Sequence, residues 1–302
     1  MPDAAVAVVV RTKDRPEFLA RAIRSIVGQT TTDWQCVIVN DGGAPAPVDA
    51  QLAALSPEIR ARFSVIHSPA ARGRWVSANA GVLATTAPLL VLHDDDDTWH
   101  PDFLRRATEY LEAHPDRAGV VSRIEIVWEK SSPEGFVPVD REIFQADLPA
   151  PTLNDTLLFN RFVPIGFLYR RALHEELGLY DDQLPVVGDW AFNLKVLSRG
   201  PLDFLGDEPL AYWHQRVGVA GSGGNSVIEA RGAHELWDAR IREAALREYV
   251  DAHGMGLVLY LTKFIDKRLF EVESGLRGEV LASSLWRRTA RRVRAGLRRS
   301  AH

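Results

Sequence analysis

Residues 88–101 read PLLVLHDDDDTWHP, an apolar run followed by four consecutive aspartates. The apolar part, Pro88–His93, is typical of a strand covered on both faces. Asp94–Asp97 then place four carboxyl groups where that strand ends. Ligands of parallel sheets bind beyond the carboxyl ends of the strands, so this segment is the first candidate for a functional site.

The segments that precede this stretch alternate between strand and helix patterns. Val6–Val10 is an apolar, β-branched run, and Pro16–Val27 has apolar residues at helical spacing after a capping box expected from Asp14 and Glu17. Further strands are expected at Gln35–Val39 and Phe63–His67, with a helix at Trp75–Thr85. Strands that alternate with helices predict an α/β, Rossmann-like fold with a mostly parallel sheet flanked by helices.

The remainder of the chain predicts a helix-rich C-terminal part. Helices are expected at 101–113 and 189–198 and strands at 119–128, 162–169 and 202–205, followed beyond the glycine-rich turn 221–224 by helices at 227–252, 257–274 and 279–297. We therefore expect a catalytic domain over residues 1–220 and a helical extension over 221–302.

Composition excludes several classes of protein. With 46% apolar and 25% charged residues in 302, the chain can form a large core, and a formal net charge of -4 argues against a nucleic-acid binder. Cys36, the single cysteine, lies in an apolar run, which excludes a disulfide within the chain. Neither a signal peptide nor an apolar run of about 18 residues is evident, so we expect a cytoplasmic protein.

The acidic cluster predicts a cation. Four adjacent carboxylates repel one another at the mouth of a sheet unless a positive charge is present. In an extended segment Asp94 and Asp96 point to the same side, and such oxygen ligands suit Mn²⁺ or Mg²⁺ shared with phosphates. The alternative is a solvated acidic turn that caps the next helix.

Four segments, in this order, resemble the glycosyltransferase family 2 enzymes. Leu92–Pro101 is similar to the family's DXD segment, and Ile38–Gly43 is similar to its second nucleotide loop. Val8–Leu19 with 25, 26 and 29 resembles the opening strand, turn and helix, and Gly178–Leu184 with 188–190 resembles the acceptor-side segment. The resemblance covers about residues 5–215. It implies a GT-A fold and inverting, metal-dependent transfer of a sugar from a nucleotide-diphosphate donor.

The resemblance also implies a nucleotide pocket. Asp41 would contact the base, with Arg11, Thr12 and Lys13 in the same pocket, and a carboxylate can accept the ring N–H of uracil. A plain Asp-Gly turn is the alternative for Asp41. Arg74 could pair with the diphosphate as a planar fork, although a surface arginine is the competing interpretation.

Within the cluster, the family pattern makes Asp94 and Asp96 the outer pair of DXD, with Asp96 as the principal metal ligand. Asp95 would lie near the ribose or sugar, and Asp97 can cap the following turn. His214 could complete the metal shell or bind the diphosphate, although a lone histidine is more often structural.

The acceptor side needs one carboxylate to take a proton from the acceptor hydroxyl. Asp189 is the candidate, and its place at a helix start is expected to keep it ionised. Capping of that helix is the alternative role. Gly188 departs from the family pattern, in which a glutamate often precedes the aspartate, so Asp182 or Asp181 remains open as the base. Trp190 could stack on a sugar, but a core anchor is at least as common.

The C-terminal tail predicts an amphipathic basic helix at 285–299. From Leu285 onward the chain has seven arginines and no acid. Such a helix can lie on anionic lipid at the inner face of the cell membrane, as suits an enzyme with a lipid-linked acceptor. A helix packed on the second domain or a frayed terminus is the alternative.

Together these features predict a glycosyltransferase that uses a UDP-sugar donor and a glycan, lipid-linked or protein acceptor in surface polysaccharide or glycoconjugate synthesis. A nucleotidyltransferase would need a glycine-rich loop after the first strand, and Arg11–Arg15 has no glycine. The alternative of another class is a non-catalytic membrane-docking or assembly module with a vestigial nucleotide site.

Overall fold

The computed structural model describes residues 4–133, 135–216 and 231–299. The chain forms two compact units, residues 1–238 and 239–302, which we describe separately. The predicted domain boundary near residue 220 falls within 217–230, outside the described residues, and stays a prediction.

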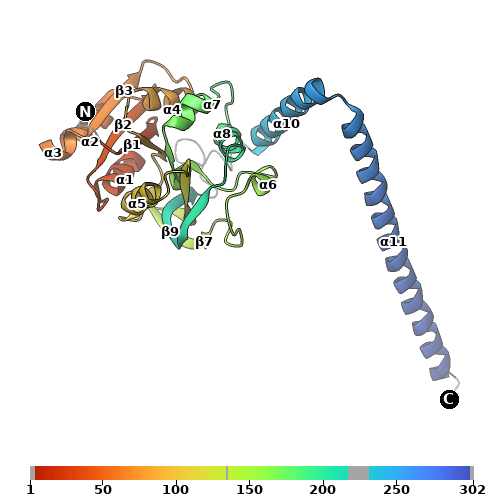
Figure 1. Cartoon of the computed structure of the whole chain (residues 1–302). Coiled ribbons are helices and arrows are strands. Elements are labelled where there is room, and N and C mark those ends of the chain that lie inside the picture. Colours follow the sequence, from red (N-terminus) through yellow and green to blue (C-terminus); the bar gives the residue numbers. More distant parts are fainter. Residues whose placement is uncertain (1–3, 134, 217–230, 300–302) are drawn as a thin grey trace. The chain divides into compact units, whose positions relative to one another are not determined.

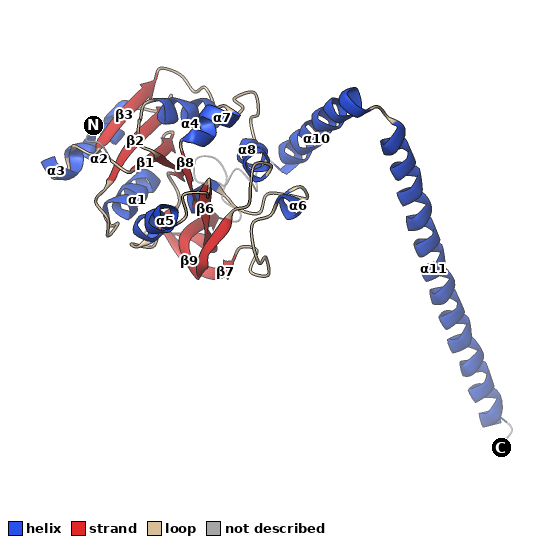
Figure 2. Cartoon of the chain, viewed as in Figure 1, coloured by secondary structure: helices blue, strands red, loops and turns tan. Residues whose placement is uncertain are grey.

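The first unit is built on one mixed sheet, which has nine strands among the described residues (Figures 1 and 2). The strands are β1 (Val6–Thr12), β2 (Trp34–Asp41), β3 (Phe63–Ser68), β4 (Leu89–Asp94), β5 (Thr98–Trp99), β6 (Gly119–Ser132), β7 (Gly135–Ile143), β8 (Phe167–Arg170) and β9 (Asp203–Arg216). Their order is β3-β2-β1-β4-β8-β6-β9-β5, and β7 pairs with β6. The first four strands in this order run parallel, and β8 enters antiparallel between β4 and β6.

Helices cover both faces of this sheet (Figure 2). They are α1 (Pro16–Val27), α2 (Pro45–Ala53), α3 (Pro57–Arg60), α4 (Arg74–Leu83), α5 (Phe103–Ala113), α6 (Leu153–Thr156), α7 (Ala172–Leu177) and α8 (Gly188–Leu197), with a 3-10 turn η1 (Pro164–Gly166). Every residue of β1 is buried, as its apolar sequence predicts for a central strand. The predicted α/β architecture, a mostly parallel sheet flanked by helices, is confirmed.

The sheet register brings the polar strand ends together. Arg11 of β1 lies opposite Asp94 of β4, and Thr12 lies opposite Asn40 of β2. The parallel strands therefore deliver their polar carboxyl-terminal residues to one edge. α4 packs very closely on β1, because a Cβ at Gly81 would lie 2.2 Å from Cγ1 of Val9.

The second unit consists of helix. α10 (Arg231–His253) runs across the boundary between the units, and α11 (Gly256–Arg299) follows it. The predicted break between helices at 274 and 279 is wrong, because α11 continues through Gly275 at the modest cost of a helical glycine, about 1 kcal/mol. Among the described residues, no helix combines the length and apolar character needed to cross a membrane.

The start of α1 also differs from the prediction. Arg15 occupies the N-cap position and makes no side-chain cap hydrogen bond. Asp14 instead has a positive φ of 51°, and its Oδ1 accepts a hydrogen bond from the backbone N–H of Ala44 at 2.9 Å. Asp14 therefore joins the turn after β1 to the start of α2, and the predicted capping box is absent.

Candidate functional site

The acidic cluster lies where the central strands end. Asp94 is the last residue of β4, and Asp95, Asp96 and Asp97 follow it, with exposed fractions of 0%, 8% and 3%. Carboxyl groups this deeply buried need partners, because burial of an unpaired charge is strongly unfavourable.

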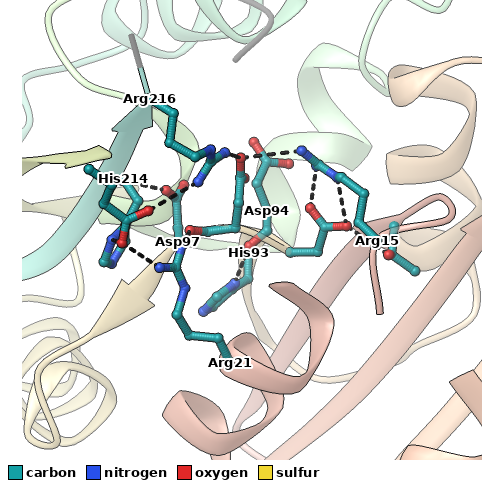
Figure 3. A network of polar contacts seen from close by, with 11 residues as sticks. Arg15, Arg21, His93, Asp94, Asp97, His214 and Arg216 are labelled. Carbon is teal, nitrogen blue, oxygen red and sulfur yellow. Dashed lines mark hydrogen bonds and ion pairs between the residues drawn. The ribbon is translucent and has the colours of Figure 1, made fainter. Parts of the chain in front are cut away.

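Arginines supply the positive charge that the sequence predicts at this cluster (Figure 3). Arg11 forms an ion pair with Asp94, and Arg15 forms one with Asp95. Nη1 of Arg15 also lies 3.3 Å from Oδ2 of Asp96. The negative charge expected to require a metal ion is thus compensated in part by side chains of the chain itself.

A second group of buried charges lies beside Asp96 and centres on Glu129 of β6. Arg216, fully buried at the end of β9, pairs with Asp96 and with Glu129, the latter at 3.3 Å. Oε1 of Glu129 also accepts from Nη1 of Arg21 at 2.5 Å and lies 2.8 Å from Nδ1 of His214. Arg21 donates in addition to the backbone oxygen of Asp96. Strands β6 and β9 and helix α1 are therefore joined to the acidic loop through one carboxylate.

The pKa values in this group follow from burial and these partners. Burial alone would raise the pKa of Glu129, but the hydrogen bond from His214 and the charge of Arg21 lower the pKa to about 2. Burial lowers the pKa of His214, which favours its neutral ring. Glu129 is therefore an anion that holds a neutral histidine and two cations.

The buried aspartates of the loop are poised differently. Burial raises the pKa of Asp95 to about 7, although Arg15 and a hydrogen bond from Thr12 Oγ1 at 2.7 Å act against this rise. Burial and the charge of Asp96 raise the pKa of Asp97, whose Oδ1 accepts from the backbone N–H of His214 at 3.0 Å. Asp97 is thus tied to β9.

Two carboxylates of the loop suit a hard cation, and His214 suits it less well. The described residues contain no group of three or more histidine, cysteine, aspartate or glutamate side chains placed to hold an ion. Mg²⁺ commonly needs only one or two carboxylates besides phosphates and waters, which Asp94 and Asp96 can provide. Both ring nitrogens of His214 are engaged, Nε2 with Thr98 Oγ1 and Nδ1 with Glu129, each at 2.8 Å. His214 as a metal ligand stays a prediction that requires one of these contacts to break.

The predicted nucleotide loop is held together by Asp41. Its two carboxylate oxygens accept from the backbone N–H groups of Arg72 at 2.8 Å and Gly73 at 3.0 Å. This places Arg74 at the first position of α4, and Nη1 of Arg11 donates to its backbone oxygen at 3.4 Å. Lys13 is exposed in the turn after β1. The contact of Asp41 with a base remains a prediction, since these hydrogen bonds show a loop-organising role.

Asp189 lies in the first turn of α8, within the reach of charges from the donor loops. Its Oδ2 accepts from Asn160 Nδ2 at 2.9 Å, and Asn193 donates in turn to Asn160 Oδ1 at 2.9 Å. Burial raises the pKa of Asp189, and the charges of Arg74 and Arg11 only partly oppose the rise. The expected effect of the helix start is therefore outweighed by burial, and a higher pKa makes the carboxylate a stronger base.

The alternative bases are placed less favourably. Asp181 and Asp182 are exposed in the loop before α8. Oδ1 of Asp181 accepts from the backbone N–H of Gln183 at 3.0 Å, and Oδ1 of Asp182 accepts from its side chain at 2.8 Å. Asp189, in contrast, is half-buried, and the charges of Arg11 and Arg74 act on it.

Trp75 explains why glycine precedes Asp189. A Cβ at Gly188 would lie 2.5 Å from Cε2 of Trp75, so the glutamate of the family pattern does not fit here. Trp190 is buried, and its Nε1 donates to the backbone oxygen of Thr156 at 2.7 Å. Trp190 is therefore a core anchor, and the sugar-stacking role is excluded by its burial.

Sequence reasoning missed several members of this site. Their shared feature is a buried or half-buried polar side chain whose partner lies far away in the sequence, and they are Arg15, Arg21, Glu129, Asn160, Asn193 and Arg216. Glu129 carried the clearest signal, since it follows the apolar strand 119–128 directly. The partners of these residues are about 30 to 120 positions away, so no local pattern could connect them.

Comparison with known proteins identifies the family of the chain. The model of the family described as "Glycosyl transferase family 2" matches residues 7–178, which contain both donor loops. The chain belongs to glycosyl transferase family 2. The predictions of the family and of a glycosyltransferase enzyme are confirmed.

Relatives of this glycosyltransferase carry matching names. YwdF of Bacillus subtilis, named an uncharacterised glycosyltransferase, is 31% identical over 192 residues, which are 63% of this chain and 67% of the relative. A PGL/p-HBAD biosynthesis glycosyltransferase of Mycobacterium tuberculosis is 25% identical over 197 residues, 65% of this chain and 71% of the relative.

Solved structures confirm the GT-A fold. The S. aureus TarS 1-349 structure in complex with UDP superposes with a TM-score of 0.55 at 17% identity, over 69% of this chain and 60% of that one. The complex with UDP-GlcNAc gives a TM-score of 0.56 at 18% identity, over 71% of this chain and 59% of that one. The glycosyltransferase thus spans about three-fifths of the length of these TarS chains.

Proposed function

We propose that this glycosyltransferase is an inverting, metal-dependent enzyme that moves a sugar from a UDP-sugar to an acceptor hydroxyl. The observation that carries the proposal is the gathering of Asp94–Asp96, Arg11 and Arg74 with a half-buried carboxylate, Asp189, of raised pKa. The two TarS complexes, which hold UDP and UDP-GlcNAc, favour a uridine nucleotide.

In this mechanism the chain's own residues bind the donor and remove one proton. Arg11, Arg15 and Arg74 are guanidinium groups that can bind a diphosphate through paired hydrogen bonds. Asp189, oriented by Asn160, accepts the proton of the acceptor hydroxyl as that oxygen attacks the anomeric carbon. One base acting opposite the leaving group gives inversion.

Asp94 and Asp96 would hold a Mn²⁺ or Mg²⁺ ion. When bound, the ion supplies charge stabilisation to the departing diphosphate. Aspartates freed from their arginines become available as oxygen ligands, and the arginines become available to phosphate oxygens.

We place the enzyme in surface polysaccharide or glycoconjugate synthesis, acting in the cytoplasm on a glycan, lipid-linked or protein acceptor. The names of the mycobacterial relatives support glycoconjugate synthesis. The arginine-rich residues 285–299 lie in α11, whose residues 257–276 include many exposed large apolar side chains. That combination supports peripheral contact with anionic lipid.

Donor hydrolysis tests the proposed function. Purified protein with Mn²⁺ is incubated with UDP-glucose, UDP-GlcNAc and UDP-galactose, and free UDP is measured. We expect release from at least one donor, and a loss of about 10²- to 10⁴-fold in kcat for Asp189→Asn with an unchanged Kd for UDP, because the base acts only in the chemical step. Asp182→Asn, at an exposed acid in the loop before α8, is the control. Absence of UDP release from all donors would instead support a non-catalytic docking module.

A further inference from the structure

Three consecutive apolar side chains are exposed on the first unit directly after α6. Leu157, Leu158 and Phe159 have exposed fractions of 50%, 66% and 45%. In the described part of this unit, the other large apolar side chains with such exposure are isolated in sequence, at 83, 139 and 236. Clustered exposed apolar groups, unlike single ones, mark binding surfaces. We call residues 157–159 the apolar platform.

The platform is held in place on both sides. The Arg161 guanidinium lies 3.7 Å from the ring centroid of Phe159, and its Nε donates to the backbone oxygen of Asp155 at 2.8 Å. On the other side, Trp190 Nε1 donates to the backbone oxygen of Thr156 at 2.7 Å, which ties α6 to α8. The exposure of the platform therefore belongs to an anchored turn.

The platform is also next to the candidate base. Asn160, the residue that follows Phe159, donates its side-chain N–H to Oδ2 of Asp189 at 2.9 Å. Consecutive Cα atoms are about 3.8 Å apart, so the platform begins within one residue of this contact. An acceptor hydroxyl that reaches Asp189 carries the rest of the acceptor across the neighbouring surface.

We propose that the apolar platform binds an alkyl chain attached to the acceptor sugar, so that the substrate is a lipid-type glycoside. The inference rests on the proposed function, because it takes Asp189 as the base that receives the acceptor hydroxyl. A second protein chain fits the platform less well, since a stable protein interface takes about 20 to 30 residues a side. Three anchored apolar side chains suit a short aliphatic chain.

Paired glycosides test the platform. Methyl and octyl β-glycosides of glucose, galactose, mannose, N-acetylglucosamine and rhamnose are titrated calorimetrically into the full-length protein with saturating UDP and Mn²⁺, below the micelle concentration of the octyl compounds. For at least one sugar, the octyl glycoside is expected to bind at least tenfold more tightly than the methyl glycoside. Equal affinities within all five pairs, or no binding by any octyl glycoside, would overturn the proposal.

Matched serine variants locate the effect. Leu158→Ser removes the most exposed side chain of the platform. Leu83→Ser is the matched control, because Leu83 has a similar exposed fraction of 70% and lies outside the platform on the same unit. The octyl advantage, defined as the Kd of the methyl glycoside divided by that of the octyl glycoside, should fall at least threefold in Leu158→Ser and stay unchanged in Leu83→Ser. An affinity ratio between octyl and methyl glycosides that is unchanged in both variants would contradict the proposal. So would a molar mass in analytical ultracentrifugation that falls only in Leu158→Ser, because it would show that the platform binds a second copy of the chain. Donor hydrolysis that persists while the octyl advantage is absent refutes the platform alone, whereas lost hydrolysis refutes the proposed function.

Discussion

At Asp189, burial and two arginines act on one carboxyl group in opposite directions. Burial raises its pKa, while Arg74 and Arg11 limit the rise. The hydrogen bond from Asn160 favours the ionised form, because an N–H donor stabilises a carboxylate more than a carboxylic acid. A hydrogen bond from the backbone N–H of Trp190 also lowers the pKa. The base strength of Asp189 thus depends on burial, on its own helix start and on neighbours from separate parts of the chain.

Asn160→Ala should therefore move the acid limb of the pH profile. Asp189 must be ionised to act as a base, so activity falls as the pH drops through its raised pKa. Loss of the Asn160 hydrogen bond raises that pKa further and shifts the limb of kcat/KM for donor hydrolysis to higher pH. The Asp181→Asn control should leave the limb in place. Superimposable profiles of wild type and Asn160→Ala would refute the positioning role of Asn160.

At the scale of helices and strands, the Glu129 carboxylate links several elements of the first unit. One carboxylate from β6 holds Arg21 of α1 together with His214 and Arg216 of β9. Removal of one partner from a buried ion pair typically costs about 3 to 5 kcal/mol, because the remaining charges stay buried. The arrangement of the acidic loop therefore depends on contacts between elements far apart in sequence.

Glu129→Gln should lower stability at neutral pH and flatten its acid dependence. Because folding lowers the pKa of Glu129 from 4.5 to about 2, its contribution is present above pH 4.5 and is lost as the pH falls toward 2. Urea unfolding at pH 7 and between pH 5 and 2 measures this effect. Glu125→Gln on the same strand, whose partner Arg141 is exposed, is the control. An equal acid dependence of the Glu129→Gln and wild-type proteins would contradict the assignment.

Many of the helices and strands could be predicted from the sequence, and the incorrect predictions have physical causes. The strands β1, β2 and β4 each contain a continuous apolar run, which identified them in the sequence. β9 extends to Arg216, well beyond the predicted end at 205, because its pairing with β6 overrides the charged residues 207 and 208. The loops at the strand ends followed from the parallel topology. The arginine partners of Asp95 and Asp96 could not be predicted, because these ion pairs join residues from separate strands and helices.

For the whole molecule, the arginine-rich end of α11 bears on where the enzyme works. Residues from Leu285 onward carry seven arginines and no acid. Each basic residue close to an anionic bilayer contributes about 1 kcal/mol to binding. The described ion pairs of the donor loops join residues between 11 and 216, which all lie in the first unit.

Removal of residues 285–302 should abolish binding to vesicles without altering the donor site. Full-length protein is expected to co-sediment with vesicles that contain about 30% phosphatidylserine and to dissociate from them in high salt. It should not co-sediment with vesicles of phosphatidylcholine alone. The truncated protein should stay in the supernatant and bind UDP with the wild-type Kd. Equal co-sedimentation of both proteins would show that the tail makes no lipid contact.

The measurement that tests the central claim most directly is calorimetric titration of UDP, GDP and dTDP with and without Mn²⁺, for wild type and Asp96→Asn. Asp182→Asn serves as an exposed acidic control, and thermal melts establish that each variant is folded. We predict that UDP binds at least tenfold more tightly with Mn²⁺ and that Asp96→Asn removes this gain, because the proposed function assigns the carboxylate of Asp96 as a ligand of the ion. Failure of all three nucleotides to bind the folded wild-type protein under either condition would contradict the donor site.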